Sequence, residues 1–168
     1  MSAETENGNR CGVVLTRVDA APGTAPHVHP DIDGFWTSLR EGQLSLQRCG
    51  DCATLRFPIA THCYQCLSGD YEWESIDPHG TVEVAIEAHR AVSELPASGV
   101  SLPDPWRAMT PYLTGAVDMA AGVRLPGRII CRCGAALTPG TEVIAVLLPA
   151  ENGATLFGFA HDCQWKEN

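Results

Sequence analysis

The chain has 168 residues, of which 45% are hydrophobic and 18% are charged, a composition typical of one globular domain or two small ones. No apolar run approaches the roughly 18 residues needed to cross a bilayer, and the polar segment Met1–Arg10 does not resemble a secretory signal, so we expect a cytoplasmic protein. The net charge of -9, from 20 acidic and 11 basic residues, argues against nonspecific binding of nucleic acid, which depends on Lys and Arg.

The first elements predicted are an extended arm and a short helix. Residues 1–30 are polar and rich in Ala, Gly, Pro and Thr, with a short strand predicted at Val13–Val18. A helix is expected from Asp31 to a stop at Gly42, because apolar residues recur at i, i+3, i+4 and i+7. These residues are Ile32, Phe35, Trp36 and Leu39.

Four of the eight cysteines form two Cys-x2-Cys pairs separated by ten residues: Cys49, Cys52, Cys63 and Cys66. In a reducing compartment, clustered cysteines are more often metal ligands than disulfides. Each pair fits a tight turn whose N–H groups point at the sulfurs, and two facing turns supply four tetrahedral thiolates, so we predict one structural zinc ion in a zinc ribbon. The alternatives are four free thiols or two disulfides.

An all-cysteine site leaves no position open for water, so zinc catalysis is not expected. His62 precedes Cys63 and is a candidate substitute ligand, a candidate outer hydrogen-bond donor, or an exposed loop histidine.

From Gly80 onward the pattern is that of β-strands. In Thr81–Ala88 the apolar residues Val82, Val84 and Ile86 alternate with the others, which predicts a half-buried strand. A long Pro-rich loop at 91–111 carries Trp106. Four more strands form two hairpins with turns at Ala120–Gly122 and Asn152–Gly153: Tyr112–Met119, Val123–Ile130, Thr141–Leu148 and Ala154–Ala160.

Five β segments in a row favour a small closed barrel. We therefore predict a mainly β protein in three parts: an arm at 1–30, a helix and zinc ribbon at 31–77, and a five-stranded barrel at 78–168.

Several groups of residues match a known family. Those of the helix and first cysteine turn are Phe35, Trp36, Leu39, Glu41, Gly42, Leu44, Leu46, Gln47, Arg48, Cys49 and Cys52. Those of the second turn and the barrel entry are Arg56, Phe57, Pro58, Cys63, Cys66, Trp73, Gly80, Thr81, Val82, His89 and Arg90. Those of the later barrel are Pro111, Tyr112, Gly122, Val123, Arg124, Leu125, Gly127, Gly140 and Val143.

Over roughly residues 31–160 the chain resembles the thiolase-associated family that joins a rubredoxin-like zinc ribbon to an OB-fold barrel, long catalogued as a domain of unknown function. The resemblance implies a non-catalytic accessory subunit that forms a hetero-oligomer with a thiolase-superfamily enzyme and supports assembly and substrate access. Such an enzyme acts on acyl-CoA, as a thiolase, an acyltransferase, or a retro-aldolase of the kind that shortens steroid side chains. The longer arm and an extra thiol pair at Cys131 and Cys133 depart from the family pattern.

Candidate docking residues are the aromatic and apolar side chains of the helix, Phe35, Trp36 and Leu39, together with Trp106 of the long loop. Large aromatic side chains are good interface anchors. The alternative for the helix is packing against the chain's own ribbon.

Two further groups carry polar chemistry. Arg124 and Arg128 share one face of a strand, with Arg132 beyond it, and are candidate contacts to the phosphates of acyl-CoA, or an ordinary solvated face. Cys131 and Cys133 are a candidate redox pair, or half of a second metal site with His161 and Cys163, or reduced loop thiols.

The sequence contains no nucleophile elbow and no Gly-rich phosphate loop, so no catalytic residue is predicted. The rival functions are a stand-alone OB-fold binder of single-stranded nucleic acid and a lone acyl-CoA carrier. The nucleic-acid function needs a basic groove with stacking aromatics, whereas the segment from Pro78 has six basic and nine acidic residues.

Overall fold

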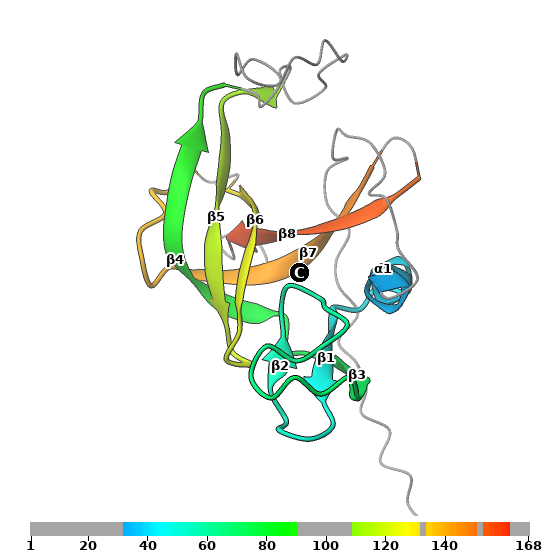
Figure 1. Ribbon diagram of the computed structural model, residues 1–168. Helices are drawn as coiled ribbons and strands as arrows, with labels where there is room; N and C mark the ends of the chain where they lie inside the picture. Colours follow the sequence, from blue (N-terminus) through cyan, green and yellow to red (C-terminus); the bar gives the residue numbers. More distant parts are fainter. Residues whose placement is uncertain (1–31, 91–108, 132–133, 151–152, 162–168) are drawn as a thin grey trace, which may run out of the picture.

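The computed structural model describes residues 32–90, 109–131, 134–150 and 153–161 (Figure 1). The predicted arm, its strand at Val13–Val18, and Trp106 lie outside the described residues. Among the described residues, one helix, a three-stranded sheet and a closed barrel follow one another, which confirms the predicted mainly β class. No helix in this part of the chain has the length and apolar character needed to cross a membrane.

Helix α1 (Asp33–Arg40) is short and ends where the sequence predicts. Gly42 takes a left-handed conformation with φ of 88° and donates its N–H to the carbonyl of Leu39 at 3.1 Å, which closes the last turn. Asp33 in the first turn and Arg40 in the last turn both suit the helix dipole.

The ribbon sheet consists of β1 (Ser45–Cys49), β2 (Leu55–Arg56) and β3 (Tyr71–Ser75), arranged β2-β1-β3 and antiparallel throughout. β1 is the central strand, and all five of its residues pair with β3. Because β1 ends at Cys49, the first cysteine turn leaves the sheet at that end.

The barrel strands are β4 (His79–Ala88), β5 (Tyr112–Met119), β6 (Arg124–Ile130), β7 (Glu142–Pro149) and β8 (Thr155–His161). They close in the order β4-β5-β6-β8-β7, with β7 returning to β4. Every pairing is antiparallel except that of β6 with β8. This is the five-stranded Greek-key barrel of an OB-fold, as predicted.

A β-bulge in β4 changes which side chains face the core. Val82 pairs with Val117, but the next pairing is Val84 with Ala116, so Glu83 is an extra residue in the strand. Val82 is 1% exposed, whereas Val84 and Ile86 are 45% and 58% exposed. The alternation read from the sequence therefore fails after Val82, because one inserted residue moves the following side chains to the opposite face.

One buried apolar cluster runs through the helix, the ribbon and the barrel. Its members are Phe35, Leu39, Leu44, Leu46, Leu55, Ile76, Val82, Val117, Met119, Leu125, Ile129, Val143, Ala145, Leu147 and Phe159. Phe35 of α1 meets Phe157 of β8 edge-to-face, with ring centroids 5.9 Å apart. The ribbon and the barrel thus share a core, and the predicted boundary between residues 77 and 78 crosses it.

Candidate metal centre and outer barrel face

The two cysteine turns have the same backbone geometry. Cys49 accepts a hydrogen bond at its carbonyl from the N–H of Ala53 at 3.0 Å, and Cys63 accepts one from Leu67 at 2.8 Å. Ala53 and Leu67 follow the second cysteine of each pair and have positive φ angles of 58° and 65°. The left-handed residue reverses the chain, so the sulfurs of each pair point the same way.

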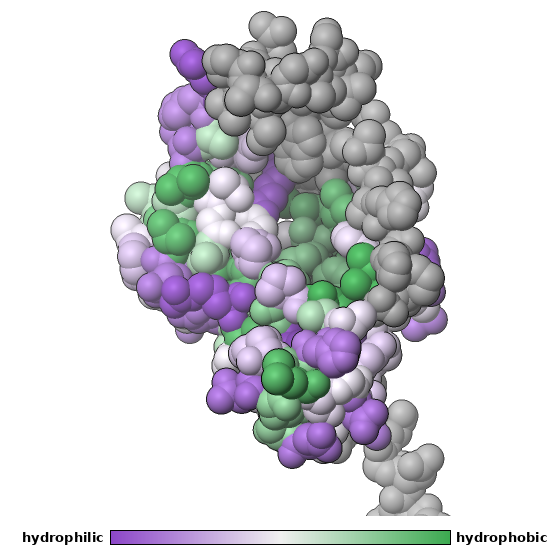
Figure 2. Space-filling view, viewed as in Figure 1, coloured by the Kyte–Doolittle hydropathy of each residue, from purple (hydrophilic) through white to green (hydrophobic). Residues whose placement is uncertain are grey.

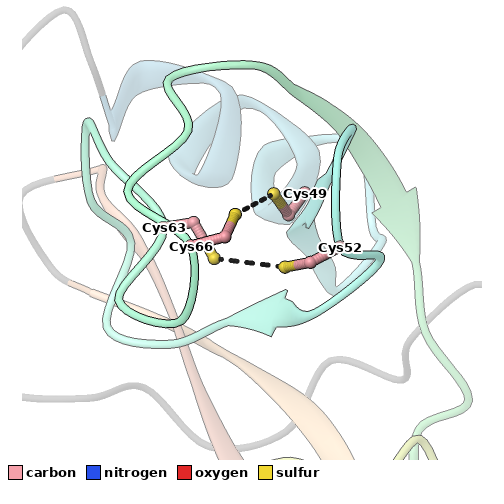
Figure 3. Close-up of side chains that lie close together, drawn as sticks. All are labelled: Cys49, Cys52, Cys63 and Cys66. Atoms are coloured by element: carbon pink, nitrogen blue, oxygen red, sulfur yellow. Dashed lines mark hydrogen bonds between the residues drawn. The ribbon is translucent and has the colours of Figure 1, made fainter.

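The four sulfur atoms converge on one centre (Figure 3). All of them lie within 4.8 Å of one another. Sγ of Cys49 is 3.5 Å from Sγ of Cys66, and Sγ of Cys52 is 3.6 Å from Sγ of Cys63. A zinc tetrahedron with Zn–S bonds of about 2.3 Å has edges of about 3.8 Å. The donor set and its spacing fit a structural zinc ion, as predicted.

The charges around the sulfurs also favour a cation. Hydrogen bonds from the backbone N–H of Cys52 and from the side chain of Arg56 lower the pKa of Cys49 to about 5. The backbone N–H of Ser68 acts in the same direction on Cys66, but the neighbouring Cys52 and burial outweigh it and raise the pKa of Cys66 to about 12. Four thiolates this close repel one another, and a bound Zn²⁺ removes that repulsion.

Arg56 is a fully buried cation beside this centre. Its Nη2 donates to the carbonyls of Ser68 and Asp70 at 3.2 and 2.6 Å. Its Nε and Nη1 are buried and have no hydrogen-bond partner of good geometry. Burial alone would lower the pKa of Arg56, but the nearby thiols of Cys49 and Cys63 outweigh it and raise that pKa. Four thiolates and one Zn²⁺ carry a net charge of about -2, which Arg56 partly compensates.

His62 lies outside the cluster that gathers the four sulfurs. It is exposed, and its Nδ1 is 3.0 Å from Oγ1 of Thr61. Of the three roles considered for it, the exposed loop histidine agrees with this placement.

The side chains of α1 that were predicted to dock on a partner pack mostly against the protein's own core. Phe35 is 4% exposed and Leu39 is fully buried. Trp36 is partly buried and packs against the same core, with its ring 5.1 Å from that of Phe35. A short helix beside a small barrel does have a core to cover, because β8 offers Phe157 to it. Neither Phe35 nor Leu39 is therefore accessible to a partner.

The candidate arginines differ in their surroundings. Arg124 donates to both carboxylate oxygens of Asp118, at 2.6 and 2.8 Å, and lies 3.3 Å from Glu83. These carboxylates already neutralise it. Arg128 lies on the same outer face of β6, opposite Thr114 of β5. Arg132 lies outside the described residues.

The outer face of β4, β5 and β6 carries a group of apolar side chains beside the charged residues Asp118, Arg124 and Arg128, which the sequence did not reveal. The bulge places Val84 and Ile86 there, beside Ala116 and Thr114 of β5. Pro126 of β6 continues the row from Ala116 and is exposed. Figure 2 shows apolar side chains gathered over β4. We call this surface, defined by Val84, Ile86, Thr114, Ala116 and Pro126, the outer apolar face.

The outer residues of β5 and β6 can be compared with what binding of single-stranded nucleic acid requires. An OB-fold binds oligonucleotides across its second and third strands, here β5 and β6. Their outer residues include one aromatic, Tyr112, and two arginines, of which Arg124 is neutralised by Asp118. The described outer residues of these two strands thus offer one ring for base stacking, whereas single-strand binders use several aromatic side chains in a basic groove.

The candidate second thiol group is partly described. Sγ of Cys131 lies 3.8 Å from Nδ1 of His161, although 30 residues separate them in the sequence. Cys133 and Cys163 lie outside the described residues.

Comparisons with known proteins agree with the ribbon and the barrel. Residues 36–72 match the model of the ChsH2 rubredoxin-like zinc ribbon domain. A probable enoyl-CoA hydratase alpha subunit of Thermomonospora curvata is 28% identical over 134 residues, which cover 78% of this chain and 37% of that protein. The chain thus spans little more than a third of the length of this relative.

Two solved structures are also similar. A chain of the Ltp2-ChsH2(DUF35) aldolase is 26% identical, with a TM-score of 0.65 over 81% of this chain and 98% of that one. A protein of unknown function from the DUF35 family of Sulfolobus solfataricus is 14% identical, with a TM-score of 0.45 over 72% of this chain and 79% of that one. The chain thus carries a rubredoxin-like zinc ribbon of the ChsH2 type, and its resemblance to proteins that join such a ribbon to an OB-fold barrel is confirmed.

Proposed function

We propose that this chain is a non-catalytic accessory subunit of an enzyme that acts on acyl-CoA. The observation that carries the proposal is the likeness to the aldolase chain, which extends over 98% of that chain and so includes both ribbon and barrel. The name of the Thermomonospora curvata relative, an enoyl-CoA hydratase subunit, supports the same substrate class.

The chemistry of the zinc centre supports an accessory role. Four cysteines fill a tetrahedron around the ion, so none of its positions is left to bind water or a carbonyl oxygen. The zinc ion holds the two turns together, and Arg56 and the backbone N–H groups compensate its thiolates.

We further propose that the partner belongs to the thiolase superfamily and docks on the outer apolar face. Val84 and Ile86 are large aliphatic side chains on a rigid strand, where they bury area with little loss of side-chain entropy. Trp36 and Trp106 remain candidate contacts to the partner. In the assembled enzyme, Arg124, Arg128 and Arg132 are candidate contacts to the phosphates of acyl-CoA, and at Arg124 the carboxylates of Asp118 and Glu83 would compete with those phosphates.

The test is co-expression with a thiolase-superfamily protein encoded beside this chain. We expect the two proteins to co-elute and to turn over acyl-CoA together, while this chain alone is inactive. Failure to associate with any such protein, or robust turnover by this chain alone, would contradict the proposal.

The docking surface is tested by the double variant Val84→Asp with Ile86→Asp. Two carboxylates in an apolar interface should weaken partner binding at least about thirtyfold, the loss of a hot spot. The matched control is Leu67→Asp, checked for retained zinc because Leu67 belongs to the second cysteine turn; Leu67 is 76% exposed and is not a barrel residue. Loss of binding in the control but not in the double variant would place the interface on the ribbon.

A further inference from the structure

Strand β3 lies at the edge of the ribbon sheet, and one side of its backbone is unpaired. In an antiparallel pair, every second residue exchanges backbone hydrogen bonds with the partner strand. The N–H of Ile76 donates to the carbonyl of Leu44 at 2.9 Å, so the residues two and four positions earlier also bond to β1. Tyr71, Trp73 and Ser75 therefore point their N–H and C=O groups away from β1. No other strand of the described residues pairs with this edge (Figure 1).

A groove of about 700 Å³ follows the free edge, with α1 on its other side. Every residue from Glu72 to Asp77 lines it. Because successive side chains of a strand point to opposite faces, a groove that meets all of them runs along the edge of β3 and not over one face. Gly34 of α1 lets the helix approach, since a Cβ there would overlap the indole ring of Trp73. That ring is 36% exposed and packs edge-to-face on Tyr71.

The charged residues of the groove are mainly acidic. Four carboxylates line it, from Glu41, Glu72, Glu74 and Asp77, against Arg48 as the one cation of the lining. Arg48 is paired with Glu74 at 2.6 Å. The groove therefore has a net negative charge and favours a cationic occupant.

The order of these charges along β3 selects among possible occupants of the edge. If two copies of this chain paired their β3 edges antiparallel about Trp73, Glu72 of one copy would lie opposite Glu74 of the other. Like charges directly opposite destabilise a strand pair, so a second copy is a poor occupant. A strand with two cations at alternate positions would instead place them opposite Glu72 and Glu74, and the residue between them opposite Trp73.

We propose that the β3 edge binds an extended basic segment of a partner protein, which adds a fourth strand to the ribbon sheet. The segment has Lys or Arg opposite Glu72 and Glu74 and an apolar residue opposite Trp73. In this mode of recognition the main-chain hydrogen bonds give affinity and the alternate side chains give specificity. The site lies on the ribbon, separate from the outer apolar face of the barrel, and it does not depend on the reaction that the partner catalyses.

The main-chain contact is tested with the labelled peptide Ser-Thr-Lys-Val-Lys-Thr-Ser, by fluorescence anisotropy on the full-length, zinc-loaded protein. We expect saturable binding. N-methylation of the Val amide, which faces β3, should abolish it, whereas N-methylation of the first Lys amide, which faces away, should leave the affinity within about twofold. Absence of saturable binding, or equal binding of the two methylated peptides, would overturn the proposal.

The charge contact is tested by Glu72→Lys, which replaces an attraction with a repulsion and should weaken binding about fivefold. Glu142→Lys is the matched control, because it makes the same change of charge at an exposed residue of β7 and should leave the affinity within about twofold. A peptide whose second Lys is replaced by Glu should regain binding to Glu72→Lys. Equal weakening by the two variants would show attraction to the net charge of the protein alone.

Hydrogen exchange measured by NMR locates the bound peptide. The amides of Tyr71, Trp73 and Ser75 should exchange at least about tenfold more slowly when the peptide is bound, because they then donate to it. Unchanged exchange at all three amides under saturating peptide would contradict strand addition at β3.

Discussion

Arg56 gives the zinc centre a positive charge that the four cysteines cannot provide. It is fully buried, and its Nη2 donates hydrogen bonds to the carbonyls of Ser68 and Asp70. The thiols of Cys49 and Cys63 raise its pKa. Removing an outer partner of this kind typically lowers metal affinity 10–100-fold.

We therefore expect Arg56→Met to release zinc to a competing colorimetric chelator roughly tenfold more readily than the parent. Arg56→Lys keeps the charge without the forked geometry, so its rate of zinc release should lie between those of the parent and Arg56→Met. Arg48→Met is the control, because Arg48 is a ribbon arginine whose charge is engaged by Glu74 in a half-buried ion pair at 2.6 Å. Equal zinc release by Arg56→Met and Arg48→Met would show that the charge of Arg56 has no part in holding the metal.

The sequence predicted the zinc ligands because their spacing encodes a local turn. Cys49 and Cys52 belong to one turn and Cys63 and Cys66 to another, so each pair is specified within four residues. Arg56 reaches the same centre from β2 through tertiary packing, which no local spacing records. The same holds for Cys131 and His161, whose contact depends on the β6–β8 pairing.

Strand β4 shows how one residue decides which face of an element is buried. Gly115 of β5 lies opposite Ala85, just past the bulge, and a Cβ on it would come within 2.0 Å of the carbonyl oxygen of Val84. The backbones approach this closely because Gly115 has no side chain.

Gly115→Ala should lower the free energy of unfolding by roughly 2–3 kcal/mol, the upper part of the range for overpacking, because the neighbouring atom belongs to the backbone and cannot rotate away. The measurement is urea denaturation of the zinc-loaded protein. Gly69→Ala is the control, since the nearest atom to its Cβ is 3.9 Å away. If Gly115→Ala lowers the free energy of unfolding no more than Gly69→Ala does, then β4 and β5 can move apart at the bulge without cost.

The elements themselves were predicted well, because each has a local signal. Helix α1 has its apolar face and Gly42, and the hairpin between β5 and β6 has Gly122 with φ of 80°. The bulge has no such signal: Glu83 fits the alternating pattern as well as any polar residue. It is therefore tertiary closure of the barrel, and not the local sequence, that turns Val84 and Ile86 outward.

At the scale of the whole molecule, the shared core couples the ribbon to the barrel. Phe35 and Leu39 of α1 and Ile76 after β3 belong to the same buried cluster as Val82 and Phe159 of the barrel. Loss of zinc removes the binding energy that folds the ribbon, and with it the packing that the helix and ribbon give to β8.

We expect calorimetry of the zinc-loaded protein to show one cooperative transition, and chelation of zinc to lower the Tm of the barrel as well as that of the ribbon. The predicted barrel segment 78–168, expressed alone, should bind a hydrophobic dye and melt without a sharp transition. A barrel transition that keeps its temperature after chelation would show instead that residues 78–168 fold independently.

The continuous core also makes zinc supply a determinant of how much of this protein a cell retains. If the zinc ion dissociates, the loss of stability extends beyond the two cysteine turns to the barrel. The barrel then unfolds more often, and proteases cleave the unfolded chain. A fall in stability of 1–2 kcal/mol can change steady-state abundance several-fold. A cell short of zinc would then lose the protein by turnover before any change in its transcription.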